Sequence, residues 1–484
     1  MRFHAVLFPL LLVPQILAAQ VASETWFAAS PTTTPAGHDI TLFAAVWALD
    51  ETPAGNVEFQ DRGTTIITEP LVPLASGHGR IAAGGSHNCA IGIAGEVWCW
   101  GWNGDRQLGI GTLADEPSPV MVQGLPEPVT QIASGARHTC AITQSQSVWC
   151  WGYNGNGELG AGDNIQHFAP VQVVGLAAAA VEIAAGEWHN CAVLGNGEVW
   201  CWGSNLFGVL GDGTSNIALS PVMVSSLPGR AEHVGAGLNH TCAILRNTRV
   251  FCWGRNQFGQ LGDGTTNDSA VAVGVLAGRN ATMVALADYH TCMLRNNGIV
   301  RCWGRNSSGE LGDGTNTDRA TPARAAAAGR DVVAIDANFS HTCAVRWQGR
   351  VRCWGRNNTG QLGNGSTLNS NTGATVLLPN ARWAWAVATS RNGGCAQGIG
   401  GSISCWGYNT HGEVGNGTTT GPYLATPVAT AGGARLAWPR ATAYARHTVS
   451  GGWGVGTRRL RVWYPGSATV AASLSNRIDI ETVP

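Results

Sequence analysis

The chain of 484 residues predicts an all-β fold dominated by a seven-bladed β-propeller. A phrase of about 25 residues occurs seven times, for example in 189–213 as HNCAVLGNGEVWCWGSNLFGVLGDG. The first cysteines of the copies are spaced 51, 51, 51, 50, 51 and 52 residues apart. Apolar and polar residues alternate within each copy, and no apolar stripe of helical period is sustained. A fixed period near 50 residues therefore indicates a ring or solenoid of repeated β-units.

Each repeat contains a predicted hairpin built on two cysteines that have nine residues between them. Placing Cys191 opposite Cys201 pairs Ala192 with Trp200 and leaves 195–197 (Gly-Asn-Gly) as a three-residue loop, a favoured hairpin connection. The two sulfurs then face each other across the strands, which favours a disulfide within every hairpin. The predicted bridges are Cys89–Cys99, Cys140–Cys150, Cys191–Cys201, Cys242–Cys252, Cys292–Cys302, Cys343–Cys353 and Cys395–Cys405.

Two further short strands complete each repeat. Val181 to Ala185 is an apolar run upstream of the cysteine hairpin, and Pro221 to Val224 follows the Gly-Asp-Gly-Thr turn downstream of it. Four short strands make one blade of a propeller. The seven blades are predicted to occupy residues 80–431. The spacing leaves open whether the ring closes by sharing a strand between its first and last blades.

Residues 1–22 have the pattern of an export signal. Arg2 precedes an apolar run from Ala5 to Leu17, and small residues follow at 18, 19 and 22. This run is too short to span a bilayer, which favours a cleaved signal peptide. The mature protein is thus expected outside the cytoplasm, in an extracellular, cell-surface or periplasmic location. An even, patterned set of cysteines in such a compartment predicts disulfides, whereas zinc sites usually have closer cysteine pairs.

The repeat resembles that of the regulator of chromosome condensation family. The resemblance rests on G-x-x-H-T-C-A-I followed by V-x-C-W-G-x-N-x-x-G-x-L-G-D-G-T, and it covers all seven copies. It implies a seven-bladed β-propeller, in agreement with the strand count, and a partner-binding role for the loop before the histidine. Guanine-nucleotide exchange, the activity of the family's nuclear founder, is not expected, because this chain has an export signal, paired cysteines and no basic tail.

The segments 23–79 and 432–484 lack the repeat. Each resembles part of a bacterial immunoglobulin-like repeat, the first through PAGNVEFQDRG at 53–63 and the second through GTRRLRVWYPG at 456–466. Either segment alone is small for a β-sandwich, but together they approach the usual size. We therefore predict one immunoglobulin-like β-sandwich with the propeller inserted between Pro73 and Leu436. The alternative is a propeller flanked by two unrelated terminal extensions.

Composition and motifs argue against several classes of function. The formal net charge is −1, so there is no electrostatic reason to expect nucleic acid or an anionic membrane as partner. All 29 basic residues are arginine, which excludes a lysine Schiff base and a phosphate-loop lysine. No non-repeating carboxylate pair or Ser-His-Asp set is evident, so neither an enzyme nor a cofactor is expected. The alternatives are a propeller-borne hydrolase or lyase acting on polysaccharide, and a purely structural surface module.

Several repeated residues could be mistaken for a chemical site. Six blades carry a histidine two residues before the first cysteine, but repetition spreads these side chains around a ring, whereas metal ligands must converge. We expect each histidine to bond a backbone group within its own blade. The histidines are His87, His138, His189, His240, His290 and His341. Asp212, Asp263 and Asp313 could bind calcium, but an Asx-turn before a glycine explains them more simply.

The tryptophan of each C-W-G run recurs in all seven blades, and we expect it to pack between blades. These tryptophans are Trp100, Trp151, Trp202, Trp253, Trp303, Trp354 and Trp406.

The repeats differ most at the two residues just before the histidine position. Equivalent loops should place these residues in a ring around one face, and large aromatics with arginines are typical of interaction surfaces. The predicted partner-binding face comprises Arg137, Glu187, Trp188, Asn239, Asp288, Tyr289, Phe339, Arg391 and Asn392. A second variable position follows the C-W-G glycine, at Trp102, Tyr153, Ser204, Arg255, Arg305, Arg356 and Tyr408. We expect a monomer that binds a protein or glycan; ordinary loop drift is the alternative.

Overall fold

The computed structural model describes residues 80–429, apart from 93, 347–348, 380–383, 399–401 and 422–423, together with the strands of the two flanking segments. The chain divides into two compact units, Met1–Ser76 with Ala441–Pro484, and Gly77–Arg440. Within the described residues, no helix is long and apolar enough to cross a membrane. The predicted signal peptide, residues 1–22, lies outside the described residues.

The larger unit consists of seven four-stranded antiparallel sheets, each built from four consecutive strands, A to D. This confirms the predicted seven-bladed propeller. Blades 1 to 4 are β7 (Ile81–Ala83), β8 (His87–Ile91), β9 (Val97–Gly101) and β10 (Glu116–Met121); β11 (Val129–Ser134), β12 (His138–Thr143), β13 (Val148–Gly152) and β14 (His167–Gln172); β15 (Ala180–Ala185), β16 (His189–Leu194), β17 (Val199–Gly203) and β18 (Ala218–Met223); β19 (Ala231–Ala236), β20 (His240–Leu245), β21 (Val250–Gly254) and β22 (Ser269–Gly274). Blades 5 to 7 are β23 (Ala281–Leu286), β24 (His290–Arg295), β25 (Val300–Gly304) and β26 (Arg319–Arg324); β27 (Val332–Asn338), β28 (His341–Arg346), β29 (Val351–Gly355) and β30 (Ser370–Thr375); β31 (Ala384–Ser390), β32 (Gly393–Gly398), β33 (Ile403–Gly407) and β34 (Thr426–Pro427). Two short 3₁₀ turns, η1 (Leu206–Gly208) and η2 (Ala326–Ala328), lie in the connections.

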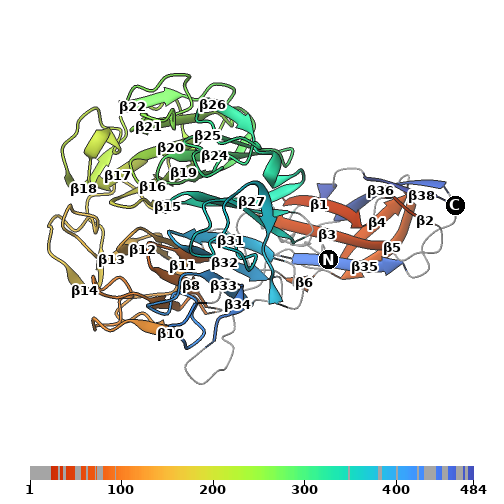
Figure 1. Cartoon of the computed structure of the whole chain (residues 1–484), viewed down its shortest axis with the longest axis horizontal. Coiled ribbons are helices and arrows are strands. Elements are labelled where there is room, and N and C mark those ends of the chain that lie inside the picture. The colour runs from red at the N-terminus through yellow and green to blue at the C-terminus, as the bar shows by residue number, and fades with distance from the viewer. Residues whose placement is uncertain are drawn as a thin grey trace, which may run out of the picture. The chain divides into compact units, whose positions relative to one another are not determined.

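The sheets surround a central axis with their A strands innermost. Each A strand contacts the A strands of its neighbours, and β31 of blade 7 contacts β7 of blade 1. Figure 1 shows the D strands β14, β18 and β22 at the outside of the ring. The ring closes without an exchanged strand, because both the first and the last sheet are contiguous in sequence. Since neighbouring strands are antiparallel, the A–B and C–D loops share one face, the loop face, and the B–C hairpins lie on the opposite face.

The cysteine hairpins have the predicted register. Cys191 pairs with Cys201 and Ala192 with Trp200, and Gly197 closes the loop with a φ of +84°. The structure contains a bridge within each of the seven hairpins, with the pairing proposed from the sequence. All fourteen cysteines are buried in the core.

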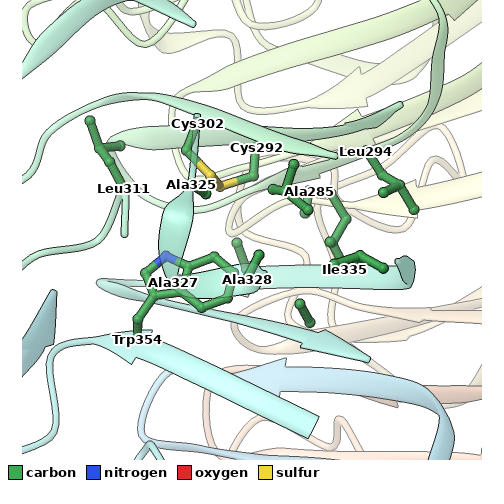
Figure 2. Close-up of a cluster of buried hydrophobic side chains, with 14 of the residues drawn as sticks. Ala285, Cys292, Leu294, Cys302, Leu311, Ala325, Ala327, Ala328, Ile335 and Trp354 are labelled. Carbon is green, nitrogen blue, oxygen red and sulfur yellow. A yellow bond between two sulfur atoms is a disulfide. The ribbon is translucent and has the colours of Figure 1, made fainter. Parts of the chain in front are cut away.

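Each hydrophobic core lies between two adjacent blades. Figure 2 shows the core between blades 5 and 6, where the Cys292–Cys302 bridge and Leu311 of blade 5 pack near Trp354 of blade 6. Trp354 is fully buried, and its Nε1 donates a hydrogen bond of 2.8 Å to the Glu310 carbonyl of blade 5. The C-W-G tryptophans therefore join neighbouring blades, as predicted.

The strands of the two flanking segments form two sheets. They are β1 (Ser23–Ser30), β2 (Thr33–Pro35), β3 (Ile40–Ala48), β4 (Asn56–Asp61), β5 (Thr64–Pro70), β6 (Val72–Pro73), β35 (Ala443–Val449), β36 (Gly456–Tyr464), β37 (Ser473–Leu474) and β38 (Ile478–Val483). One sheet has the order β1-β3-β35-β6, and the other has β2-β38-β36-β4-β5 with β37 beside β36. Both sheets thus combine strands from both ends of the chain. The immunoglobulin-like character of this unit stays a prediction.

Candidate binding face

A backbone hydrogen bond brings the two variable positions together in every blade. In blade 3 the Ser204 amide donates to the Trp188 carbonyl at 2.9 Å, and the equivalent bond recurs in the other six blades at 2.8 to 3.0 Å. The C-W-G glycine makes this approach possible. Gly203 has a φ of +104°, and a Cβ atom there would lie 2.7 Å from the Trp188 carbonyl oxygen. The loop before the histidine and the residue after C-W-G therefore form one surface.

The six histidines are buried beneath this surface. The prediction that each bonds a backbone group within its own blade is wrong. Each histidine Nε2 instead bonds a residue of the next blade, as in His189 with Thr241 Oγ1 at 2.8 Å. Thr241 Oγ1 itself donates to the Val209 carbonyl at 2.8 Å, so it must accept from a protonated Nε2. The bond crosses between blades because the loop turns the histidine ring toward the neighbour rather than along its own strand.

Burial keeps these histidines neutral. It lowers the pKa of His189 from 6.5 to about 3 and that of His138 to about 4. The six histidines do not converge on one metal ion, because each imidazole bonds across a different pair of neighbouring blades. Within the described residues, no three His, Cys, Asp or Glu side chains are grouped so that they could hold a metal ion.

The Gly-Asp-Gly-Thr aspartates form Asx-turns. Asp212 Oδ1 accepts the Thr214 amide at 2.9 Å, and Asp263 and Asp313 accept the equivalent amides at the same distance. Asp313 also forms an ion pair with Arg319 at 2.6 Å. These carboxylates are therefore engaged by their own turns.

One side-chain cluster on the loop face centres on Arg137 of blade 2. Its guanidinium lies 5.4 Å from the ring of Trp102, 6.0 Å from Tyr153 and 5.7 Å from Trp188. Tyr153 and Trp188 meet edge to face at 5.5 Å. Arg137 Nη1 also pairs with Asp105 Oδ2 at 3.3 Å, and its side chain is still 45% exposed. One cation thus orders three aromatic rings while remaining accessible to a partner.

Blades 3 to 5 form a second cluster of the same kind. The guanidinium of Arg255 lies 4.6 Å from Phe207 and 5.6 Å from Tyr289. Arg305 lies 5.8 Å from both Phe258 and Tyr289. Tyr289 and Phe258 meet edge to face at 5.3 Å.

A third cluster joins blades 6 and 7. Phe339 lies between two guanidinium groups, with Arg356 at 5.2 Å and Arg391 at 5.0 Å from its ring. Arginine and aromatic side chains therefore alternate around most of the loop face.

Three charged residues converge at the centre of the loop face. Glu187 of blade 3 forms an ion pair with Arg391 of blade 7, although 204 residues separate them. Asp288 of blade 5 lines the same central cavity and is only 6% exposed. Burial and the nearby Glu187 carboxylate raise the pKa of Asp288 to about 7, and the guanidinium groups of Arg391 and Arg305 oppose this rise only in part. Burial likewise raises the pKa of Glu187, against the effect of Arg391.

The structure does not place every predicted residue on an exposed surface. Asn239 and Asp288 are buried, and Asn392 is half-buried. A third variable position, the second residue after the WGxN asparagine, was missed. It supplies Asp105, Phe207, Phe258 and His411 to the clusters. Its variation between otherwise matching turns was the signal that could have identified it.

The comparisons with known proteins agree with this architecture. A family model described as the RCC1-like domain matches residues 55–395. The chain belongs to this family. The resemblance of the repeat to the regulator of chromosome condensation family is thereby confirmed.

Relatives within the RCC1-like family differ in function. The ultraviolet-B receptor UVR8 of Arabidopsis thaliana is 32% identical over 354 residues, which cover 70% of this chain and 78% of the receptor. The probable E3 ubiquitin-protein ligase HERC4 of Homo sapiens is 32% identical over 194 residues, 39% of this chain and 18% of the ligase. Among solved structures, Prp20p from Saccharomyces cerevisiae has a TM-score of 0.63 at 20% identity, covering 77% of this chain and 92% of that one. Human WBSCR16 has a TM-score of 0.60 at 23% identity, covering 67% and 87%.

Proposed function

We propose that this protein is an exported binding scaffold that holds a protein or glycan partner on its loop face. The two flanking segments would form one immunoglobulin-like sandwich that acts as a base or spacer. The observation that carries the proposal is the alternation of arginine and aromatic side chains at the paired variable positions of one face.

The composition and order of the face favour binding. Tryptophan, tyrosine and arginine dominate the residues that contribute most to protein interfaces. Arg137, Arg255 and Phe339 each contact two or more partners of the opposite kind, so the side chains are ordered before a partner arrives. Such preorganisation reduces the conformational entropy lost on binding.

The bridges favour a location outside the cytoplasm. Every cysteine belongs to a disulfide, a pattern typical of oxidising compartments and rare in reducing ones. Together with the sequence pattern of residues 1–22, this supports export.

The enzyme alternative receives less support. A hydrolase or lyase would require carboxylates in a pocket large enough for a sugar ring. In the part of the chain that the structure describes, Glu187 and Asp288 line a central cavity of only about 40 Å³. Such a cavity has room for a few water-sized groups.

The proposal is tested by truncating three side chains of the loop face without unfolding the propeller. The triple variant Arg137→Ala, Trp188→Ala, Tyr289→Ala should lose capture of the partner from the protein's native surroundings, while circular dichroism and the thermal midpoint show a folded propeller. The matched control is Arg249→Ala, because Arg249 is exposed and stacks on Phe251 at 5.2 Å, but lies in a B–C hairpin on the opposite face. Undiminished capture by the triple variant would show that the loop face is not the site.

A further inference from the structure

The central cavity of the loop face is built by all seven blades. Most of the residues on its wall are glycine or alanine near the ends of the A strands. An added Cβ at Gly186 would lie 2.4 Å from the Gly237 carbonyl oxygen, so glycine permits neighbouring loops to approach this closely. The polar side chains on the wall are Ser134, Glu187, Asp288, Asn338 and Arg391.

Two of these side chains have unmet hydrogen-bonding capacity. Ser134 Oγ is shielded from solvent and has no hydrogen-bond partner among the described residues. Asp288 is only 6% exposed, and in the part of the chain that the structure describes no hydrogen bond or ion pair of its carboxylate is found; its oxygens are not among the shielded atoms, so they stay open to the cavity. A largely buried carboxylate is stabilised by a donor that reaches it, and here such a donor can enter through the cavity.

The charge of the cavity indicates what kind of donor is lacking. Glu187 and Asp288 supply two carboxylates, whereas Arg391 supplies one guanidinium, which is already paired with Glu187. The raised pKa of Asp288 has the same origin, since burial and the Glu187 carboxylate are not offset by the nearby arginines. A ligand that brings one positive charge and several N–H donors would satisfy Asp288 and Ser134 together.

We propose that the central cavity receives the primary ammonium group of a lysine side chain from a protein partner, beside Asp288, Glu187 and Ser134. This rests on the proposed function, since the surrounding arginine–aromatic face would hold the rest of the partner. Lysine carries three N–H donors on a slender four-carbon stem, which suits a cavity of small volume. A cavity of about 40 Å³ admits an ammonium group and not a sugar ring. The side chains of Glu187 and Arg391 remain 13% and 38% exposed, so the cavity can be reached from the face.

The test measures binding of the probe n-butylammonium to the full chain by ligand-observed NMR titration. We expect saturable binding that n-butanol and tetramethylammonium do not reproduce, since the first lacks the charge and the second lacks N–H donors. Asp288→Asn keeps the shape of the side chain and should raise the dissociation constant at least tenfold. The matched control is Asp336→Asn, another buried carboxylate, which accepts the Thr389 amide and lies outside the cavity; it should bind the probe normally.

Three results of the probe titrations would overturn the inference. They are equal binding of n-butylammonium and tetramethylammonium, unchanged binding by a folded Asp288→Asn variant, or binding of glucosamine as tight as that of n-butylammonium. The last would assign the cavity to an amino sugar. Partner capture separates the two proposals. If Asp288→Asn keeps full capture while the triple face variant loses it, the binding face stands and the lysine site fails.

Discussion

Acid should destabilise the propeller because its six buried histidines stay neutral in the folded state. Burial lowers their pKa from 6.5 to about 3 or about 4, so below pH 6.5 the unfolded chain takes up protons that the folded chain does not. Stability is therefore lost as the pH falls through this range. The residues concerned are His87, His138, His189, His240, His290 and His341.

The size of the loss follows from the two sets of pKa values. Between pH 7.5 and 5.5 each histidine contributes about 1.4 kcal/mol, or about 8 kcal/mol for the ring. Buried carboxyl groups work in the opposite direction, because burial raises the pKa of Asp288 to about 7 and that of Asp336 to about 6. These two aspartates offset about 3 kcal/mol of the loss over the same interval. Burial also raises the pKa of four glutamates, which adds to this effect: Glu158, Glu187, Glu310 and Glu413. His233, whose pKa is raised by its bond to Glu182, also opposes the loss. The expected net loss is at most about 5 kcal/mol, which can still be a large part of an ordinary unfolding free energy.

Guanidinium chloride unfolding at pH 7.5 and 5.5, followed by tryptophan fluorescence with the bridges intact, measures this difference. In His189→Gln the difference between the two pH values should shrink by about 1.4 kcal/mol, because one of the six sites no longer titrates. A free energy of unfolding that stays constant within about 1 kcal/mol, or rises toward acid, would refute the assignment of buried neutral histidines.

Three other perturbations probe the scaffold. Asp288→Asn should be more stable than the native protein at pH 8, by up to about 4 kcal/mol, and nearly equal to it at pH 4, because the folded-state pKa is raised from 3.8 to about 7; equal thermal midpoints at pH 8 would contradict this. Removing one disulfide by Cys242→Ala with Cys252→Ala should lower the free energy of unfolding by about 3 kcal/mol, as measured with denaturant. An unchanged midpoint would show that this disulfide does not stabilise the propeller. Gly254→Ala should cost about 2 kcal/mol or more, because its φ is +104° and a Cβ would lie 2.5 Å from the Asn239 carbonyl oxygen. A neutral effect in the same assay would mean that the loop relaxes freely.

Local geometry made much of the fold predictable. Nine residues between two cysteines, with a glycine-rich centre, leave one sensible antiparallel register, and the structure has Cys191 opposite Cys201. The repeat then extends this register around the ring. The loop residues were placed in a ring for the same reason, since equivalent positions in a closed repeat lie on one face.

Contacts between blades were harder to infer. The bond from His189 to Thr241 joins residues 52 apart, and its partner depends on how far one blade is rotated against the next. The ion pair of Glu187 with Arg391 spans nearly half the ring. Nothing in the repeat says which loop side chains turn toward the axis, because that depends on the width of the central opening.

The closure of the ring affects which rearrangements of the gene preserve the fold. Asn88 Nδ2 and Trp100 Nε1 donate to the Glu413 carbonyl at 2.7 and 2.9 Å, as Thr139 and Trp151 do to the Gln107 carbonyl at 3.0 and 2.9 Å. The junction between the last and first blades thus repeats the tryptophan contact of the internal junctions, although Gly393 replaces the histidine there and the histidine bond is missing. A circularly permuted gene that starts at any blade would encode the same seven sheets. Likewise, duplication or deletion of one 51-residue segment would add or remove a whole blade without leaving a strand unpaired.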